Sequence, residues 1–145
     1  DLKPLEGLEF LLSINLANNK LVNVELPALK FIQILDLSNN QLVKIQDMAL
    51  PMLRHLKLNN NQIEEVSGLD GNPVLKVLEL HENKLTTCAG LGLGSLETLT
   101  LTNNEIASLE GLGGLVEVKE LDLTENKVAE LGGLPTEGKL ERLNL

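Results

Sequence analysis

Histidines, a cysteine and paired carboxylates are the residues of this sequence whose types could support catalysis or metal binding. The segment HEN at 81–83 begins like the zinc-protease helix motif, but Leu85 stands where that motif needs its second histidine. His55 and His81 have no third ligand at a matching spacing, so solvated histidines are favoured over a metal site. The adjacent acids Glu64 and Glu65 are typical of a solvated turn. The sequence predicts neither a metal site nor acid–base catalysis.

Nucleophiles and phosphate-binding glycines are equally weak candidates. The segment GLGLGS at 90–95 lacks the lysine of a phosphate-binding loop and the spacing of a dinucleotide fingerprint, so tight turns explain its glycines. No serine has a histidine placed to activate it in a recognisable motif. Cys88 is the only cysteine, and we expect a small buried hydrophobe there rather than a reactive thiol. The chain is therefore predicted to be no enzyme and to need no cofactor.

The amino-acid composition limits the classes of partner that the chain can bind. Of the 145 residues 43% are hydrophobic, yet only two are phenylalanine and none is tryptophan or tyrosine, so a stacking surface is hard to assemble. The formal charge of −9 repels nucleic acids and anionic membranes, and no apolar run has the length of a membrane span. We expect the partners to be other proteins in a multi-subunit complex, with neither nucleic acid nor membrane among them.

A repeated pattern, L-x-x-L-x-L-x-x-N-x-L, organises the whole chain. Six segments match it: LLSINLANNKL (11–21), IQILDLSNNQL (32–42), LRHLKLNNNQI (53–63), LKVLELHENKL (75–85), LETLTLTNNEI (96–106) and VKELDLTENKV (118–128). We number them repeats 1 to 6, and a partial repeat 7 begins at Leu140. The starts are 21 or 22 residues apart, which is the leucine-rich-repeat signature.

The pattern predicts an α/β solenoid, a right-handed horseshoe whose parallel sheet lines the concave face. The alternating leucines point inward, and stacked repeats bury them against one another. Glycines and prolines in the returning halves favour short turns or 3₁₀ segments on the convex side. Strands are expected at 13–16, 34–37, 55–58, 77–80, 98–101, 120–123 and 142–145.

One asparagine recurs in every full repeat: Asn19, Asn40, Asn61, Asn83, Asn104 and Asn126. An amide both donates and accepts, so a buried ladder of asparagines can satisfy the backbone groups where each strand ends. In the triple asparagine of repeat 3 we expect only Asn61 to be structural, with Asn59 and Asn60 facing solvent. Cys88 lies in the next apolar position of repeat 4, shared with Val24, Ile45, Val66, Leu109 and Leu131.

Residues 1–145 are predicted to form a single array of six full repeats with partial repeats at both ends. Because neither end shows a polar capping segment, we expect the array to belong to a longer protein. The single cysteine and the absence of N-x-[ST] acceptors favour an intracellular compartment.

The outward strand positions form the candidate binding surface. We predict partner binding by a strip over repeats 2 to 4: Ile34, Asp36, His55, Lys57, Val77, Glu79 and His81. Apolar positions among charges are typical of contact anchors, although an ordinary solvated face would have the same composition. The rival site is the acidic stretch from Glu97 to Glu117, where no lysine or arginine occurs and a basic segment could bind.

The repeat length and the L-x-x-L-x-L-x-x-N-x-[IL]-x-x-[ILV]-x-x-L rhythm resemble the subclass named after the phosphatase-1 regulator of mitotic cells. That resemblance implies an intracellular eukaryotic interaction protein. DLKPLEGLEFL, NKLVNVELPALKFIQ, VSGLD and NKLTTCAGLGLGSLETL also resemble the leucine-rich-repeat component of ciliary radial spokes. This second resemblance implies a structural scaffold of the axoneme. A phosphatase-1 regulatory subunit is the alternative, and an enzyme with this array as an appendage would need a further domain.

Overall fold

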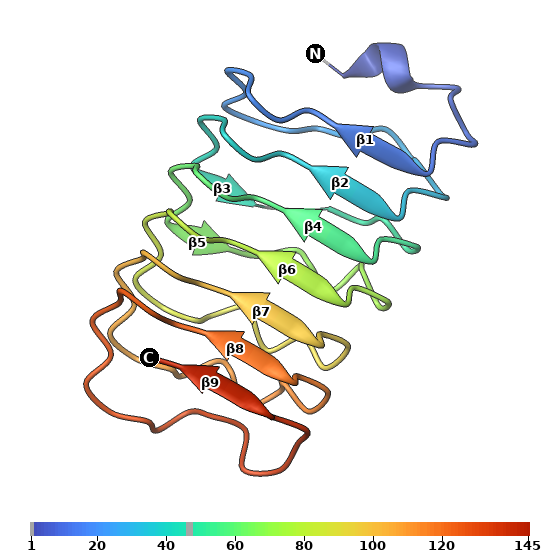
Figure 1. The fold of residues 1–145 in the computed structure, drawn as a ribbon. Coiled ribbons are helices and arrows are strands. Elements are labelled where there is room, and N and C mark those ends of the chain that lie inside the picture. Colours follow the sequence, from blue (N-terminus) through green and yellow to red (C-terminus); the bar gives the residue numbers. More distant parts are fainter. Residues whose placement is uncertain (1, 46–47) are drawn as a thin grey trace.

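Each repeat forms one turn of a solenoid in the computed structural model, which describes residues 2–45 and 48–145 (Figure 1). Seven strands form one sheet in the order β1-β2-β4-β6-β7-β8-β9, and every neighbouring pair is parallel. They are β1 Ser13–Asn15, β2 Ile34–Asp36, β4 His55–Lys57, β6 Val77–Glu79, β7 Thr98–Thr100, β8 Glu120–Asp122 and β9 Arg142–Asn144. The predicted parallel solenoid is confirmed.

The strands begin at the predicted residues but are three residues long instead of four. In β4, for example, only the central Leu56 points into the core. The next residue, Leu58, lies past the strand and is fully buried, while its N–H still donates to the carbonyl of Glu79 at 2.9 Å. The chain therefore begins its turn one residue earlier than the alternating pattern predicts, without losing the hydrogen bond to the next repeat.

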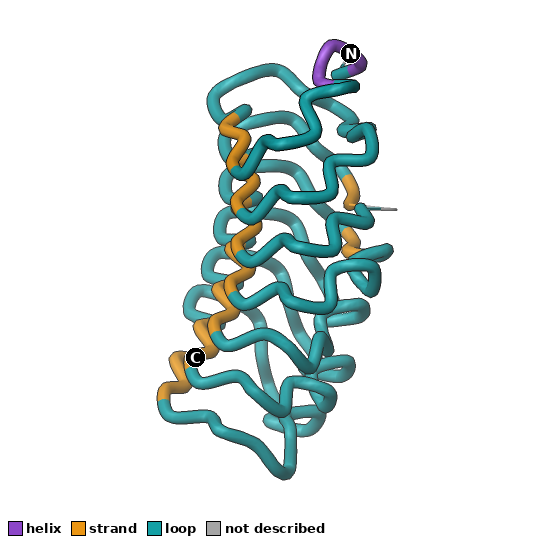
Figure 2. Tube along the Cα trace, turned by 90° about the vertical axis from the view of Figure 1, so that its right-hand side faces the viewer, coloured by secondary structure: helices purple, strands orange, loops and turns teal. Residues whose placement is uncertain are grey.

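The convex side carries almost no regular structure (Figure 2). A 3₁₀ helix, η1 Lys3–Leu5, is the only helix among the described residues, so the predicted absence of long convex helices is confirmed there. A second parallel sheet pairs β3 Lys44–Ile45 with β5 Glu65–Val66. This sheet could not be predicted from the sequence, because a two-residue strand is too short to show alternation.

Leucines stacked along the solenoid form its core. Leu35, Leu56, Leu78 and Leu99, one from each of four successive strands, are 0% exposed. Cys88 is also 0% exposed, so the expectation of a small buried side chain is confirmed. Burial raises the pKa of its thiol to about 11, which suits an inert core residue.

The asparagine ladder joins successive repeats. The side chain of Asn61 accepts from the backbone N–H of Leu42 at 3.0 Å and donates to the carbonyls of Leu37, Leu58 and Asn59. Asn40, Asn83, Asn104 and Asn126 repeat this pattern. Asn19 is exposed and donates only to carbonyls of its own repeat. The predicted ladder is confirmed, and it is strongest in the interior repeats.

The expectation that Asn59 faces solvent is wrong, whereas Asn60 is half-buried and has a left-handed backbone. Asn60 has φ +54°, and the residue before the ladder asparagine is left-handed in all six full repeats: Asn18, Asn39, Asn60, Glu82, Asn103 and Glu125. Asparagine tolerates this conformation because its short side chain can bond locally. Asn59 is 7% exposed and binds residues of the next repeat. The side chains of Asn59 and Asn61 are therefore both structural.

Candidate functional site

Strand register gathers the predicted strip on one face of the large sheet. Ile34, His55 and Val77 are directly paired across β2, β4 and β6. Asp36, Lys57 and Glu79 form the next paired row. His81 follows β6 by two residues. The seven predicted residues are thus contiguous, because neighbouring strands lie about 4.8 Å apart. Figure 2 shows this column of strands bowing inward along one side of the solenoid.

Glu79 is the centre of a hydrogen-bond network in the strip. Its Oε1 lies 2.5 Å from Nε2 of His55, and its Oε2 accepts from Nδ2 of Asn59 at 2.7 Å. The ammonium of Lys57 is 4.0 Å away. Burial alone would raise the pKa of Glu79, but the bonds from Asn59 and His55 and the charge of Lys57 outweigh it, and the pKa is lowered. The carboxylate is therefore ionised and fixed.

The same network holds the backbone of the strip. Oδ1 of Asn59 accepts from the N–H of His81 at 3.1 Å, so Asn59 connects repeats 3 and 4 through both ends of its amide. The apolar members remain open to a partner, since Ile34 is 43% exposed and Val77 is half-buried. The strip is a rigid polar centre with apolar side chains beside it. The role of Asn59 could not be predicted from the sequence, because its bonds reach residues 20 and 22 positions away.

A shallow hollow of about 430 Å³ continues from the strip toward β7. Val77, Glu79 and His81 form one wall, and Thr98, Thr100 and Thr102 form another part of the lining. Oγ1 of Thr100 is buried and has no hydrogen-bond partner among the described residues. The hollow extends the candidate surface by one strand beyond the residues predicted from the sequence.

Three of the four glutamates in the acidic stretch pair with lysines of other repeats. Glu97 lies 3.0 Å from both Lys76 and Lys119, one repeat before and one repeat after it. Glu105 pairs with Lys127 at 2.7 Å, and Glu117 pairs with Lys139 at 2.6 Å. These lysine bonds lower the pKa of each of the three carboxyls. Although this stretch contains no lysine, lysines of neighbouring repeats lie beside its carboxylates in the structure. The stretch is therefore a weaker candidate for binding a basic segment of a partner.

The chemistry of the histidines is also limited by the structure. His55 is engaged by Glu79, and Nδ1 of His81 lies 4.0 Å from Glu82. Within the described residues, no group of three or more histidine, cysteine or acidic side chains is arranged to hold a metal ion. The arrangement can present charges and apolar contacts to a partner.

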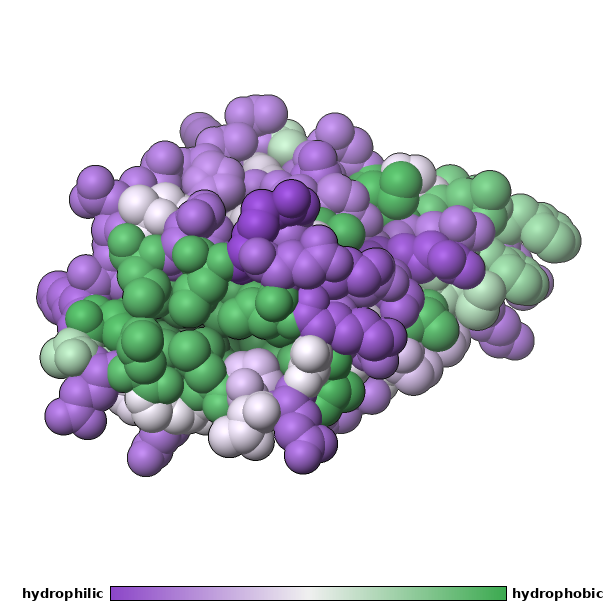
Figure 3. Space-filling model, turned by 60° about the horizontal axis from the view of Figure 1, so that its bottom comes forward, coloured by the Kyte–Doolittle hydropathy of each residue, from purple (hydrophilic) through white to green (hydrophobic). Residues whose placement is uncertain are grey.

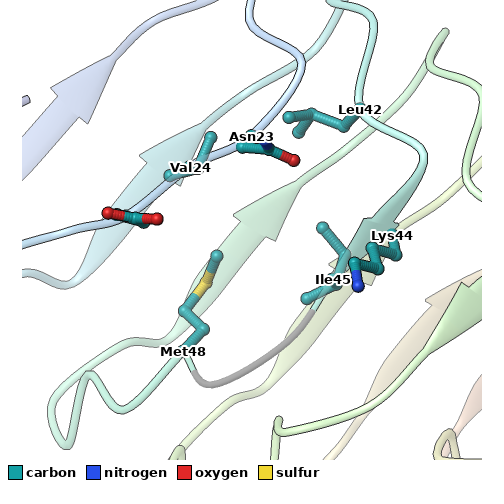
Figure 4. Close-up of a pocket in the computed structure, with 7 residues that line it drawn as sticks. Asn23, Val24, Leu42, Lys44, Ile45 and Met48 are labelled. Carbon is teal, nitrogen blue, oxygen red and sulfur yellow. The ribbon is translucent and has the colours of Figure 1, made fainter. Parts of the chain in front are cut away.

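A groove opens on the side away from the large sheet, between the returning segments of repeats 1 and 2 (Figure 4). It has a volume of about 220 Å³, with Val24, Ile45 and Met48 beside the polar Asn23 and Lys44. Between repeats 2 and 3 the equivalent residues are paired as strands, Lys44 with Glu65 and Ile45 with Val66. No such strand pair joins repeats 1 and 2 among the described residues, and the groove gathers no cluster of charges that selects a ligand.

The molecule also exposes apolar side chains at its two ends. With the C-terminal end brought forward, a contiguous hydrophobic area faces the viewer (Figure 3). Leu131 and Leu145 there are 52% and 56% exposed, in positions that the next repeat covers further up the solenoid. At the other end, the rings of Phe10 and Phe31 stack, with centroids 6.2 Å apart. The repeat thus brings the only two aromatic residues of the sequence together.

A parallel-sheet solenoid that presents fixed side chains on one face belongs to the class of repeat proteins built for extended binding surfaces. The family described as "Leucine Rich repeats (2 copies)" matches residues 51–92 and 94–136, more than half of the chain. The chain belongs to the leucine-rich-repeat family.

Solved structures support the fold. An internalin (inlF) from Listeria monocytogenes is 22% identical over 100% of this chain, with a TM-score of 0.69. Internalin C2 from the same organism is 26% identical over 95% of this chain, with a TM-score of 0.71. The chain spans 51% of the first structure and 72% of the second. The comparison with curated proteins gave no match. Among the described residues, no helix has the length and apolar character needed to cross a membrane.

Proposed function

We propose that this chain is a non-enzymatic scaffold that binds another protein through the strip on its concave face. The observation that carries the proposal is the fixed Glu79 carboxylate, held by His55 and Asn59 at the centre of the seven predicted residues. Side chains that are already ordered lose little entropy when a partner binds. The fixed Glu79 network therefore gives the neighbouring apolar and charged side chains a rigid support.

The residues of the strip contribute to partner recognition in different ways. Covering Ile34 and Val77 would contribute about 1–3 kcal/mol each if their burial were complete. Asp36, Lys57 and Glu79 set the register of the partner and select its charge pattern. His55 and His81 border the ionised Glu79 and supply further polar contacts.

The finer proposal concerns the biological assembly. The resemblance to the leucine-rich-repeat component of radial spokes supports a structural role in the axoneme of motile cilia, inside the cell. Its partners are then the neighbouring subunits of a multi-subunit complex, with neither nucleic acid nor membrane involved. The net charge of −9 supports that exclusion.

A regulatory subunit that docks protein phosphatase 1 is the second candidate. Acids on the concave columns, such as Glu79 and Asp122, support it. Both phenylalanines, however, lie outside the strands, so the aromatic contacts that this class uses on its concave face are missing. Immunoprecipitation from ciliated cells separates the two: spoke subunits support the first candidate, and the phosphatase catalytic subunit supports the second.

The choice of face has its own test. Ile34→Asp plus Val77→Asp places two charges at the apolar contacts, and we expect it to abolish capture of the immunoprecipitated partner. Glu97→Lys plus Glu105→Lys changes the rival stretch and should leave capture intact at low and high salt. Val116→Asp is the control, because Val116 is 47% exposed and lies outside the strands. Loss of capture by the second pair alone would show that the chosen face is wrong.

A further inference from the structure

A tight turn precedes the large-sheet strand in each repeat and fixes the outward position of one residue. The N–H of Leu11 donates to the carbonyl of Leu8 at 3.2 Å, and that of Leu53 donates to the carbonyl of Leu50 at 2.9 Å. The third residue of such a turn lies at its outer corner. From repeat 1 to repeat 7 the residues just before the first leucine position are Phe10, Phe31, Met52, Val74, Ser95, Glu117 and Lys139.

The first three of these residues are apolar and exposed. Phe10 is 84% exposed, Phe31 is 45% exposed and Met52 is 40% exposed. The last three repeats place polar residues in the same position: the hydroxyl of Ser95 donates to the carbonyl of Leu75 at 2.8 Å, and Glu117 and Lys139 pair with each other. Apolar side chains at this position add little to the core, so their succession over neighbouring repeats points to a contact surface.

Repeat geometry turns these side chains into a continuous ridge, defined as Phe10, Phe31 and Met52. The phenyl rings of the first two are nearly parallel, with 4° between their planes. Large, rigid aromatic side chains lose little entropy on binding and are enriched at the energetic centres of interfaces. The only two aromatic residues of the chain are both in this exposed position.

Cations accompany the ridge. Lys30 directly precedes Phe31, Arg54 follows Met52 by two residues, and both are exposed. In the part of the chain that the structure describes, neither forms an ion pair. Glu97, Glu105 and Glu117 of the later repeats are, by contrast, paired with lysines. The ridge is thus an apolar surface with the unpaired cations Lys30 and Arg54 near Phe31 and Met52, while the exposed Glu9 precedes Phe10.

We propose that the ridge is a second docking surface, which binds an apolar segment of a partner protein that carries carboxylates for Lys30 and Arg54. Aromatic rings beside cations could also stack on the bases of a nucleic acid. The net charge of −9 favours the protein segment, because a nucleic acid concentrates far more negative charge along its length. The ridge lies on turns and the strip lies on strands, so this proposal does not depend on the proposed function.

The test uses a fluorescent synthetic peptide with leucines on one helical face and glutamates beside them. Binding to the whole chain is followed by fluorescence anisotropy at low and high ionic strength. Phe10→Ser plus Phe31→Ser removes the rings without touching the core. Lys30→Gln plus Arg54→Gln removes the cations. Val116→Ser plus Leu131→Ser removes exposed apolar surface elsewhere and is the matched control.

We expect the ring variant to weaken peptide binding by about tenfold or more, and the control to bind like the unchanged protein. The cation variant should lose affinity mainly at low ionic strength, as should a peptide with glutamine in place of glutamate. Equal weakening by the control would overturn the proposal. Tighter binding of an oligouridine probe would also overturn it, because the occupant would then be a nucleic acid. A dimer in sedimentation that becomes a monomer in the ring variant would overturn it as well, because the occupant would then be a second copy of the chain.

Discussion

Replacing Asn61 by alanine removes four hydrogen bonds, but it leaves only one buried group without a partner. The carbonyl of Leu37 keeps the amide of Asn40, that of Leu58 keeps the amide of Asn83, and that of Asn59 keeps the N–H of Asn39. Among the described residues, the N–H of Leu42 has no other acceptor, and Leu42 is 1% exposed. The energetic cost is therefore concentrated on that donor.

The expected loss of stability follows from these lost hydrogen bonds. A buried N–H without an acceptor costs about 1–3 kcal/mol, and the second bonds lost by the three carbonyls add about 1 kcal/mol. We expect Asn61→Ala to lower the free energy of unfolding by about 2–4 kcal/mol. With a urea m-value of about 2 kcal/mol/M, the unfolding midpoint falls by about 1–2 M.

Two matched variants isolate the cause. Asn19→Ala changes the same repeat position, but Asn19 is exposed and accepts no N–H from another repeat, so its cost should stay below about 1 kcal/mol. Asn60→Gly changes the adjacent residue and keeps its left-handed backbone, so it should be nearly neutral. Urea unfolding monitored by circular dichroism gives the midpoints. A loss for Asn19→Ala as large as that for Asn61→Ala would refute the argument from the orphaned donor.

Three further predictions concern single groups. Gly90 has φ +78°, and a Cβ there would lie 2.2 Å from the carbonyl oxygen of Val66. Gly90→Ala should therefore lower the free energy of unfolding by more than about 2 kcal/mol, as measured by thermal unfolding. Gly113→Ala is the control and should cost little, because a Cβ there meets no atom within 4 Å. The pKa of Glu79 is lowered from 4.5, so its contribution to stability is complete above pH 4.5 and is lost as the pH falls through the lowered value. Glu79→Gln should therefore reduce the loss of stability below pH 4.5, and an unchanged acid dependence would contradict the role of the network. The Cys88 thiol, buried and with a pKa of about 11, should react with iodoacetamide only when urea unfolds the chain, and rapid labelling of the native protein would contradict its burial.

The repeated features of the fold could be predicted from the sequence because each is specified several times. Leu56 and Asn61 occupy positions that recur in every full repeat, so the pattern shows both the strand and the ladder. The left-handed residue could not be predicted from its type, since glutamate takes the place of asparagine at Glu82 and Glu125. A backbone conformation imposed by the repeat overrides the preference of the side chain there.

The candidate site was only partly predictable for a different reason. Alternation places Glu79 on the outward face, but the bonds that fix it come from His55 and Asn59 of the preceding repeat. The pairing of Glu97 with Lys119 likewise joins residues 22 positions apart. Such contacts depend on register between repeats, so a charge count along the sequence misses them. Comparing charges at a spacing of one repeat is the signal that could have found them.

The two candidate surfaces lie in the first four repeats, and the ion pairs between lysine and glutamate gather in the repeats that follow. The buried leucines and the asparagine ladder occur in both halves, so the core does not determine which residues occupy the outward positions. In repeats 1 to 3 the turn before the strand carries Phe10, Phe31 and Met52, whereas later turns carry Glu117 and Lys139, which pair with each other. Exposed ion pairs contribute little to stability, whereas exposed apolar groups gain most from a partner. The N-terminal half is therefore the part of this array in which changes to surface residues should alter binding while leaving stability intact.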